Sequence, residues 1–415
     1  MMRKEKTSVN EQMHAAMAEA MRLTREGRLA EATAVIQRTL GGTLVAPTGG
    51  SGGVGGPPET TSDAVNEGLG PAASRRPGSA EHGLRRAPKP PRGFRSEARV
   101  SGGLPGTMPG ARIVTPAEVS AGGWFVERSY TGRDGSRAYK LYIPSGYVGQ
   151  EVPLVVMLHG CTQSPDDLAT GTRMNQLAEE HTFLVAYPAR AATANSSRCW
   201  KWFEAADQQR GRGEPSLIAG ITCEVVGEYH VAVDRVYVAG MSAGGAMAAI
   251  MGATYPDLYA AIGVHSGLAP GAAQDLHSAF TAMRQGQPNT RGENTPSEGS
   301  ARTMPAILFH GDRDTTVHPS NADHLLAHYR ATTLGEPPRV TNRQGRVPGG
   351  HAYTCATYHD ADGRVIVERW IVHGLGHAWS GGSLPGSYTD PKGPCASAEM
   401  VRFFHQHPRQ RGPMG

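Results

Sequence analysis

Ser242 is the residue of this chain with the clearest potential for chemistry. It lies in the segment Gly240-Met241-Ser242-Ala243-Gly244, between a β-branched and aromatic run at 236–238 and a helix-like segment at 246–255. The spacing G-x-S-x-G is typical of a nucleophile elbow, a tight strand-to-helix turn that exposes a serine hydroxyl. With 54 glycines in 415 residues, such a short pattern can arise by chance, so its context must support it. If the context does so, the chemistry is acyl transfer.

A serine hydroxyl attacks a carbonyl only when a base removes its proton. His377 is the predicted base, because the glycines beside it let a loop bring the imidazole over a sheet. Asp314 is the predicted acid that orients this imidazole, although Asp312 is close enough to be an alternative. His373 ends an apolar alternation and is predicted to pack instead. The order Ser, Asp, His along the chain is the order that α/β-hydrolases use.

An oxyanion also needs two N–H donors, and removal of one such donor costs about 3 kcal/mol. The backbone amides of Cys161 and Ala243 are predicted to supply them. Cys161 lies in a His-Gly-Cys-Thr-Gln segment at 159–163, directly after an apolar run. It is less suited to be a second nucleophile, because no His/Asp pair is left for it.

The elements that would position these residues alternate between strand-like and helix-like patterns, which predicts a parallel sheet in one α/β domain over residues 121–408. An antiparallel hairpin is expected to precede this sheet. Ligands of such sheets bind at the carboxyl ends of the strands, where the candidate residues fall. The predicted strands are 125–130, 138–143, 154–158, 183–187, 236–239, 261–264, 306–310 and 369–373, and the predicted helices are 166–180, 216–229, 246–255, 321–332 and 397–405.

The N-terminal part differs in composition. Residues 9–40 predict a helical hairpin from their apolar stripes, and residues 41–120 predict a disordered linker rich in Gly, Pro and Arg. A single hairpin cannot bury both of its faces, so self-association through these helices is one expectation. A weakly ordered helical arm is the other.

Composition excludes several classes of function. The net charge of +4 gives no reason to expect nucleic acid binding. The longest apolar runs have five residues, far below the roughly 20 that a membrane span needs. No secretory signal is visible after the first basic residues. The five cysteines are scattered without a C-x-x-C pair, so no metal and no cofactor is expected.

Several motifs together resemble the polyhydroxybutyrate (PHB) depolymerase family of esterases. They are Leu158–Gln163, the aromatic segment Cys199-Trp200-Lys201-Trp202-Phe203, Arg210–Glu214, Gly240–Gly245, His310–Asp314 and Gly376–Trp379. The resemblance implies an α/β-hydrolase that cleaves esters of short hydroxyacids, with relatives that cleave feruloyl or acetyl esters on plant polysaccharide. It also implies an extracellular protein, whereas the missing signal makes the cytoplasm the alternative. A disulfide between Cys161 and Cys199 and two reduced thiols both stay open.

The sequence therefore predicts a serine esterase without a cofactor, acting on hydroxyalkanoate esters or oligomers. Trp200, Trp202 and Trp379 are predicted to bind substrate, with core packing an equal explanation for at least two of them. The alternatives are a feruloyl or acetylxylan type of esterase, a serine peptidase with the same triad, and a non-catalytic binding protein on a hydrolase fold.

Overall fold

A computed structural model of the chain describes residues 122–190, 198–286, 304–333 and 339–409, together with the single helical positions 19 and 35. Apart from those two positions, the predicted helical hairpin at 9–40 and the predicted linker at 41–120 lie outside the described residues. The linker, the helical arm and their role in self-association therefore stay predictions.

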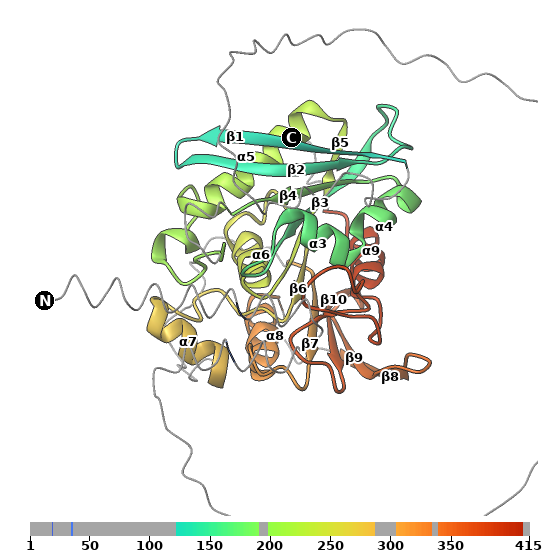
Figure 1. Cartoon of the computed structure of the whole chain (residues 1–415). Helices are drawn as coiled ribbons and strands as arrows, with labels where there is room; N and C mark the ends of the chain where they lie inside the picture. Colours follow the sequence, from blue (N-terminus) through green and yellow to red (C-terminus); the bar gives the residue numbers. More distant parts are fainter. Residues whose placement is uncertain are drawn as a thin grey trace, which may run out of the picture. The chain divides into compact units, whose positions relative to one another are not determined.

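Within the described residues, ten strands form one twisted sheet in the order β1-β2-β4-β3-β5-β6-β7-β10-β9-β8 (Figure 1). The strands from β4 to β10 in this order are parallel, and the two at either edge are antiparallel. Their bounds are β1 (Trp124–Gly132), β2 (Gly135–Ile143), β3 (Val152–Leu158), β4 (Leu184–Pro188), β5 (Val231–Met241), β6 (Ala261–His265), β7 (Ala306–Gly311), β8 (Arg339–Arg346), β9 (Ala352–His359) and β10 (Val365–Val372). A second sheet pairs β11 (Trp379–Ser380) with β12 (Thr389–Asp390).

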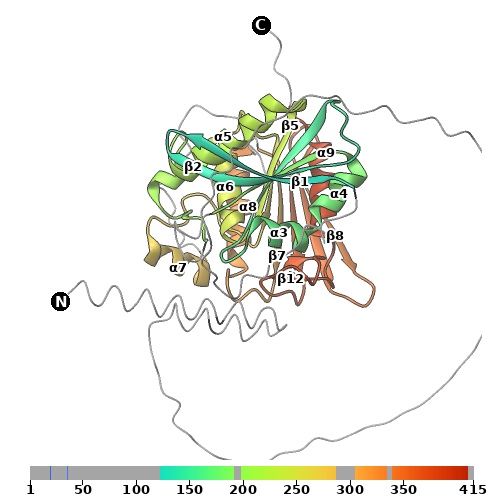
Figure 2. The same ribbon diagram turned by 45° about the horizontal axis from the view of Figure 1, so that its top comes forward.

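The central strands are apolar because both of their faces are covered. Every residue of β3, β4, β6 and β7 is buried, as expected for parallel strands between two helical layers. One layer contains α5 (Gly213–Glu228), α6 (Ala243–Thr254), α7 (Leu276–Gln285) and α8 (Ser320–Thr333), and the other contains α3 (Pro165–Thr172), α4 (Met174–His181) and α9 (Ala396–Gln406). Figure 2 shows these layers on either side of the sheet.

The strand register brings the predicted catalytic segments to one edge. Gly240 of β5 is paired with Leu158 of β3, and Met241 is paired with His265 of β6. Further across the sheet, beyond β6, Gly311 of β7 is paired with Val372 of β10. The loops that follow β3, β5, β7 and β10 therefore leave the same edge of the sheet side by side.

Among the differences between the structure and the sequence prediction, those in α3 and α4, in β8 and in α7 have clear physical reasons. The predicted helix at 166–180 is two helices, because Arg173 adopts a left-handed conformation with φ of 55°. The edge strand β8 was not predicted, since its sequence RVTNRQGR is mostly polar and lacks the apolar alternation of a half-buried strand. The helix α7 was not predicted either, although its N-terminus carries an Asp275–Ser278 capping box.

The described residues include neither a membrane-spanning helix nor a metal-binding cluster. No helix there is both long and apolar enough to cross a bilayer. No group of three or more His, Cys, Asp or Glu side chains there is arranged to hold a metal ion.

Candidate active site

Ser242 lies between the last residue of β5 and the first residue of α6. Its backbone has φ of 56° and ψ of −121°, a strained conformation that residues with a side chain adopt at a cost of about 1–3 kcal/mol. Its N–H donates to the carbonyl of His265 at 2.9 Å, which fixes the turn from the neighbouring strand. Such strain persists only where the surroundings impose it, and it is typical of catalytic residues.

The glycines of the elbow are required by close approaches of backbone. A Cβ atom on Gly240 would overlap the carbonyl of Gly244, and one on Gly244 would overlap the carbonyl of Leu158. Helix α6 therefore starts in direct contact with the end of β3. The N–H of Ala243, the first residue of α6, has no intrahelical acceptor and lies at the positive end of the helix dipole.

Asp314 and His377 form a buried hydrogen-bonded pair. The Nδ1 of His377 lies 2.7 Å from Oδ2 of Asp314, and their side chains are 6% and 0% exposed. The other oxygen of Asp314 accepts from the amides of Thr316 and Val317 at 2.9 and 2.8 Å. Burial alone would raise the pKa of Asp314, but His377, His310 and the Val317 amide outweigh it and lower the pKa to about 2. The carboxylate is therefore ionised at any pH where the fold is expected to persist.

The loops that carry this pair are joined by the backbone. The N–H of Arg313 donates to the carbonyl of Leu375 at 3.0 Å. A side chain at Gly311 would overlap that same carbonyl. The loop after β7 and the loop after β10 thus form one unit.

Asp312 binds a different histidine. Its Oδ2 lies 2.9 Å from Nδ1 of His373, and its Oδ1 accepts from the amide of Gly374 at 2.7 Å. The two side chains are 36% and 44% exposed. His373 also lies 2.9 Å from the hydroxyl of Thr354. The prediction that His373 packs is wrong, because its side chain lies at the surface, where it is hydrogen-bonded to Asp312.

The predicted oxyanion loop lies against the elbow. A Cβ atom at Gly160 would be 3.6 Å from Cβ of Ser242. The side chain of Gln163 accepts from the Gly160 amide at 2.9 Å and closes this turn. Among the described residues, none accepts a hydrogen bond from the amide of Cys161. The loop can therefore present this N–H near the serine hydroxyl.

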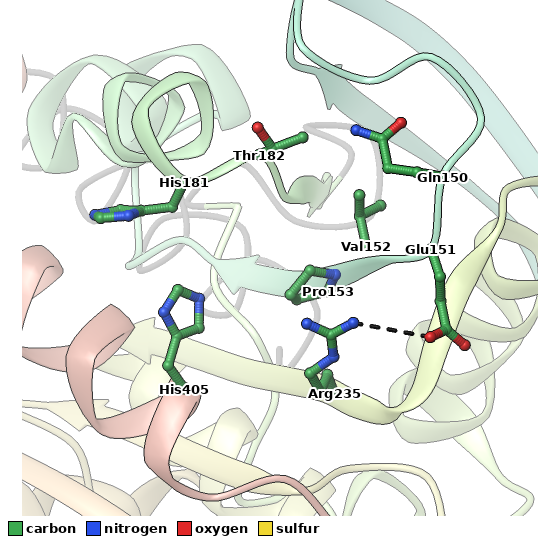
Figure 3. Close-up of a pocket in the computed structure, with 8 residues that line it drawn as sticks. All are labelled: Gln150, Glu151, Val152, Pro153, His181, Thr182, Arg235 and His405. Atoms are coloured by element: carbon green, nitrogen blue, oxygen red, sulfur yellow. Dashed lines mark ion pairs between the residues drawn. The ribbon is translucent and has the colours of Figure 1, made fainter.

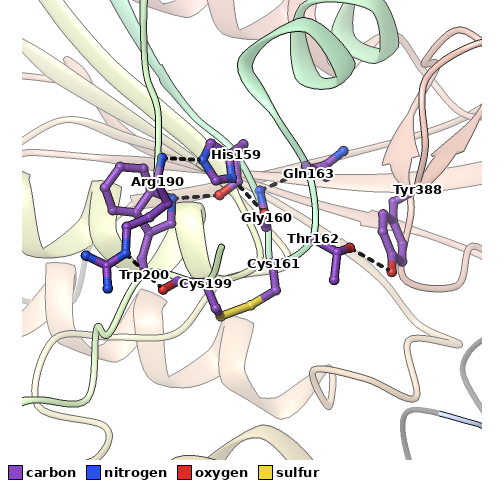
Figure 4. The surroundings of a disulfide bond; sticks show 9 residues. All are labelled: His159, Gly160, Cys161, Thr162, Gln163, Arg190, Cys199, Trp200 and Tyr388. Carbon is purple, nitrogen blue, oxygen red and sulfur yellow. Dashed lines mark hydrogen bonds between the residues drawn. A yellow bond between two sulfur atoms is a disulfide. The ribbon is translucent and has the colours of Figure 1, made fainter. Parts of the chain in front are cut away.

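Cys161 is bonded to Cys199, so the structure decides the alternative that the sequence left open (Figure 4). The backbone N–H of Arg190 donates to Nε2 of His159 at 3.1 Å, and its Nε donates to the carbonyl of Cys199 at 3.3 Å. The guanidinium of Arg190 is also paired with the buried Glu214. The oxyanion loop is thus tied to the segment that begins at Arg198 by one covalent bond and by Arg190.

Two buried histidines support the site as neutral side chains. Burial lowers the pKa of His159 to about 4 and the pKa of His265 to about 3. Nε2 of His265 accepts from the amide of Ser380 at 3.0 Å, while its backbone carbonyl accepts from Ser242. His265 therefore connects the nucleophile turn to the chain that follows His377. The sequence did not single out either histidine, because their role depends on contacts between strands.

The three tryptophans predicted to bind substrate are buried, at 0% exposure for Trp200, 4% for Trp202 and 1% for Trp379. The indole N–H of Trp200 donates to the carbonyl of His159 at 2.8 Å, and that of Trp379 donates to the hydroxyl of Ser397 at 3.1 Å. In this structure they offer no open face to an acyl chain. Trp200 thereby contacts the start of the loop after β3, and Trp379 contacts α9.

Tyr388 is a residue at the site that the sequence did not indicate. Its ring lies edge-on to the ring of His377, with centroids 6.4 Å apart, and its hydroxyl lies 3.4 Å from Oγ1 of Thr162. It belongs to a segment rich in Gly and Ser between β11 and β12. A tyrosine in such a segment has no pattern that would distinguish it.

A cavity of about 290 Å³ lies away from these residues, where β3 begins and where α4 and α9 end. Figure 3 shows His181 and His405 on one side of it and Arg235 and Glu151 on the other side, and the two imidazole rings are in edge-on contact. None of the predicted catalytic residues lines this cavity. It is distinct from the candidate active site.

Several known proteins resemble this chain in sequence or in fold. Residues 137–334 match the family model described as esterase PHB depolymerase. Poly(3-hydroxyalkanoate) depolymerase C of Paucimonas lemoignei is 33% identical over 247 residues, which cover 57% of this chain and 57% of that protein. Feruloyl esterase B of Neurospora crassa is 30% identical over 249 residues, which cover 57% of this chain and 81% of that protein.

Among solved structures, an acetyl xylan esterase from Aspergillus awamori superposes with a TM-score of 0.53 at 21% identity. The match covers 68% of this chain and 99% of that structure. At this identity the likeness shows the α/β-hydrolase fold, in agreement with the predicted fold class.

Proposed function

This chain belongs to the PHB depolymerase family of esterases, and we propose that it hydrolyses carboxylic esters through an acyl-enzyme on Ser242. The hydroxyl of Ser242 attacks the ester carbonyl while His377 takes up its proton. Asp314 holds the imidazole and stabilises its charged form. His377 then returns the proton to the leaving alcohol. In the second half of the reaction, His377 takes a proton from a water molecule that attacks the acyl-enzyme, and it returns this proton to Ser242 as the acid is released.

The tetrahedral intermediates carry a negative oxygen that needs N–H donors. The amides of Cys161 and Ala243 supply them in this proposal, one from the loop after β3 and one from the start of α6. These donors are backbone groups, so their positions depend on the loops and not on side-chain identity. Neither step needs a metal ion or a redox cofactor.

The observation that supports the proposal most is the Asp314–His377 hydrogen bond of 2.7 Å. It is buried at the same sheet edge as a serine in a strained turn. A carboxylate that is hydrogen-bonded to Nδ1 leaves Nε2 of the imidazole as the basic nitrogen. A histidine with a purely structural role would not require a buried carboxylate partner at the same sheet edge as a nucleophile elbow.

For the substrate, we propose hydroxyalkanoate esters or their oligomers, since the relative from Paucimonas lemoignei is named a poly(3-hydroxyalkanoate) depolymerase. The second candidate is a feruloyl or acetylated polysaccharide ester, favoured by the 81% coverage of feruloyl esterase B. The matched segment spans little more than half of the depolymerase, so the comparison concerns the catalytic region. A panel of hydroxybutyrate oligomers, methyl ferulate, acetylated xylan and p-nitrophenyl butyrate separates these candidates.

Ser242→Ala tests the proposed nucleophile. We expect it to abolish hydrolysis of every ester that the wild type cleaves, because no other group can form the acyl-enzyme. Ser129→Ala, at an exposed position of β1, is the matched control and should retain wild-type rates. Undiminished turnover by Ser242→Ala contradicts the proposal, and a wild type that cleaves no ester favours a binding protein.

A further inference from the structure

The segment after His377 returns over the active-site edge and is fixed there by its own backbone. β11 and β12 are paired between Trp379 and Thr389, so the residues between them form a closed loop. The amide of Ser383 donates to the carbonyl of Gly171 at 2.8 Å. The hydroxyl of Thr389 donates back to the carbonyls of Ser383 and Gly386. The loop at 381–390 is therefore well ordered by hydrogen bonds.

The side chain of Asp167 joins this loop to α3, and the side chain of Gln163 joins it to the loop after β3. The amide of Ser387 donates to Asp167 of α3 at 2.8 Å, and its hydroxyl also donates to that carboxylate. Nε2 of Gln163 donates to the carbonyl of Ser387 at 3.2 Å, while its Oε1 accepts from Gly160. Tyr388, the next residue, is thus placed relative to the oxyanion loop by Gln163.

Tyr388 and Thr162 are both held in left-handed backbone conformations, with φ of 52° and 68°. Such conformations are uncommon for β-branched and bulky residues, and residues held in them gather at functional sites. Thr162 is the residue after the proposed donor Cys161, and the ring of Tyr388 lies beside the ring of the proposed base His377. The contact between the two hydroxyls therefore joins the segment of the proposed oxyanion donor to the residue beside the proposed base.

Their separation of 3.4 Å is longer than the roughly 2.5–3.0 Å of a strong O–H···O hydrogen bond. A threonine hydroxyl has one proton and two lone pairs, so the Thr162 oxygen can bind a further oxygen atom beside Tyr388. A hydroxyl on the acyl part of an ester, two carbons from the carbonyl, has the right chemistry for such a site. An unsubstituted acyl chain has no group that could use it.

We propose that Tyr388 is a specificity-determining residue, whose hydroxyl together with Thr162 binds the 3-oxygen of a 3-hydroxyacyl ester. The proposal rests on the proposed function, because it takes Ser242, His377 and the Cys161 amide as the groups that surround the reacting carbonyl. It assigns discrimination between hydroxyacyl and plain acyl esters to one phenolic hydroxyl.

The test compares p-nitrophenyl 3-hydroxybutyrate with p-nitrophenyl butyrate, which differ only in the 3-hydroxyl. The measured quantity is the ratio of their kcat/KM values in the full chain. Tyr388→Phe removes one hydroxyl and keeps the ring, so we expect this ratio to fall about three- to tenfold, the effect of one net hydrogen bond. Tyr130→Phe on β1 is the matched control and should keep the wild-type ratio.

Thr162→Ser keeps the hydroxyl and should keep most of the ratio, whereas Thr162→Ala should lower it. In Tyr388→Phe/Thr162→Ala the two losses should not add, since both variants remove the same site. An unchanged ratio in Tyr388→Phe, or an equal loss on both esters, overturns the proposal. If the wild type cleaves neither ester, the proposed function itself fails, and this outcome is distinct from an unchanged ratio.

Discussion

Asp312 and Asp314 lie two residues apart on the loop after β7, and each is hydrogen-bonded to a different histidine. The Asp314 side chain is 0% exposed and accepts three hydrogen bonds, whereas the Asp312 side chain is 36% exposed. A buried carboxylate that orients an imidazole has a large effect on catalysis, while an exposed pair contributes about 0–1 kcal/mol to stability. Replacing aspartate by asparagine is therefore expected to lower catalysis much more at residue 314 than at residue 312.

We predict that Asp314→Asn lowers kcat on p-nitrophenyl butyrate by a factor on the order of 10³ to 10⁴, because the amide favours the wrong imidazole tautomer. Asp312→Asn should lower it by less than about fivefold. Steady-state kinetics of the two variants, with circular dichroism to verify folding, checks both values. Equal losses in the two variants would show that the assignment of the acid is wrong.

At the scale of elements, the site is formed by loops that leave consecutive parallel strands. The central strands were predictable, since five-residue apolar runs such as 154–158 that alternate with helical patterns indicate buried strands. Helix α6 and the Ser, Asp and His segments after the strands were predictable for the same reason. Contacts between loops were not predictable, because they depend on strand order and on which side of a loop each residue faces.

Four residues illustrate that limit. Trp200 lies in an aromatic segment that suggests a ligand site, yet its indole N–H is bonded beneath the oxyanion loop. Tyr388 lies in a Gly/Ser segment without pattern, yet it is next to His377. The pairing of Cys161 with Cys199 depends on the distance between two loops, which spacing in sequence does not give.

The disulfide leads to a prediction at this scale. It closes a loop of 38 residues that includes the predicted oxyanion donor, and loops of this length stabilise by about 2–4 kcal/mol. We expect Cys199→Ser to lower the free energy of unfolding by that amount and to lower kcat as well, since the Cys161 amide loses its tether. Urea unfolding and kinetics, each with and without reductant, measure the two effects.

Cys223→Ser is the control, because Cys223 is an unbonded, exposed cysteine on α5. It should behave as the wild type, and reductant should then affect only proteins that retain the Cys161–Cys199 bond. If reduction leaves both the stability and the kcat of the wild type unchanged, the disulfide does not support the oxyanion loop.

At the scale of the whole molecule, the sheet separates two core clusters and has the candidate active site at one edge. The histidines buried near that edge affect the stability of the entire fold. Because the pKa values of His159 and His265 in the folded state are lowered to about 4 and about 3, the unfolded chain binds protons there first. Protonation of these side chains below the usual histidine pKa of 6.5 therefore favours unfolding.

We predict that the free energy of unfolding is constant near neutral pH and falls as the pH drops from about 6.5 towards 4. The loss should be on the order of 1 kcal/mol per pH unit for each of the two histidines. Asp314 does not contribute in this range, since its stabilisation is present above its unfolded pKa of 3.8 and is lost only as the pH falls through about 2. Urea unfolding at pH 7.5, 6.5, 5.5 and 4.5 gives the profile.

A stability that does not change between pH 7.5 and 4.5 would contradict this assignment of neutral, buried histidines.

The central claim is that Ser242 forms the covalent intermediate, and the most direct measurement is peptide mapping by mass spectrometry after reaction with a fluorophosphonate. We predict one adduct per chain, located on Ser242, with loss of ester hydrolysis in proportion to labelling. Ser242→Ala should remain unlabelled, and Asp314→Asn should be labelled far more slowly than the wild type. Complete inactivation with the adduct on another residue, or full activity in a labelled protein, would contradict the account.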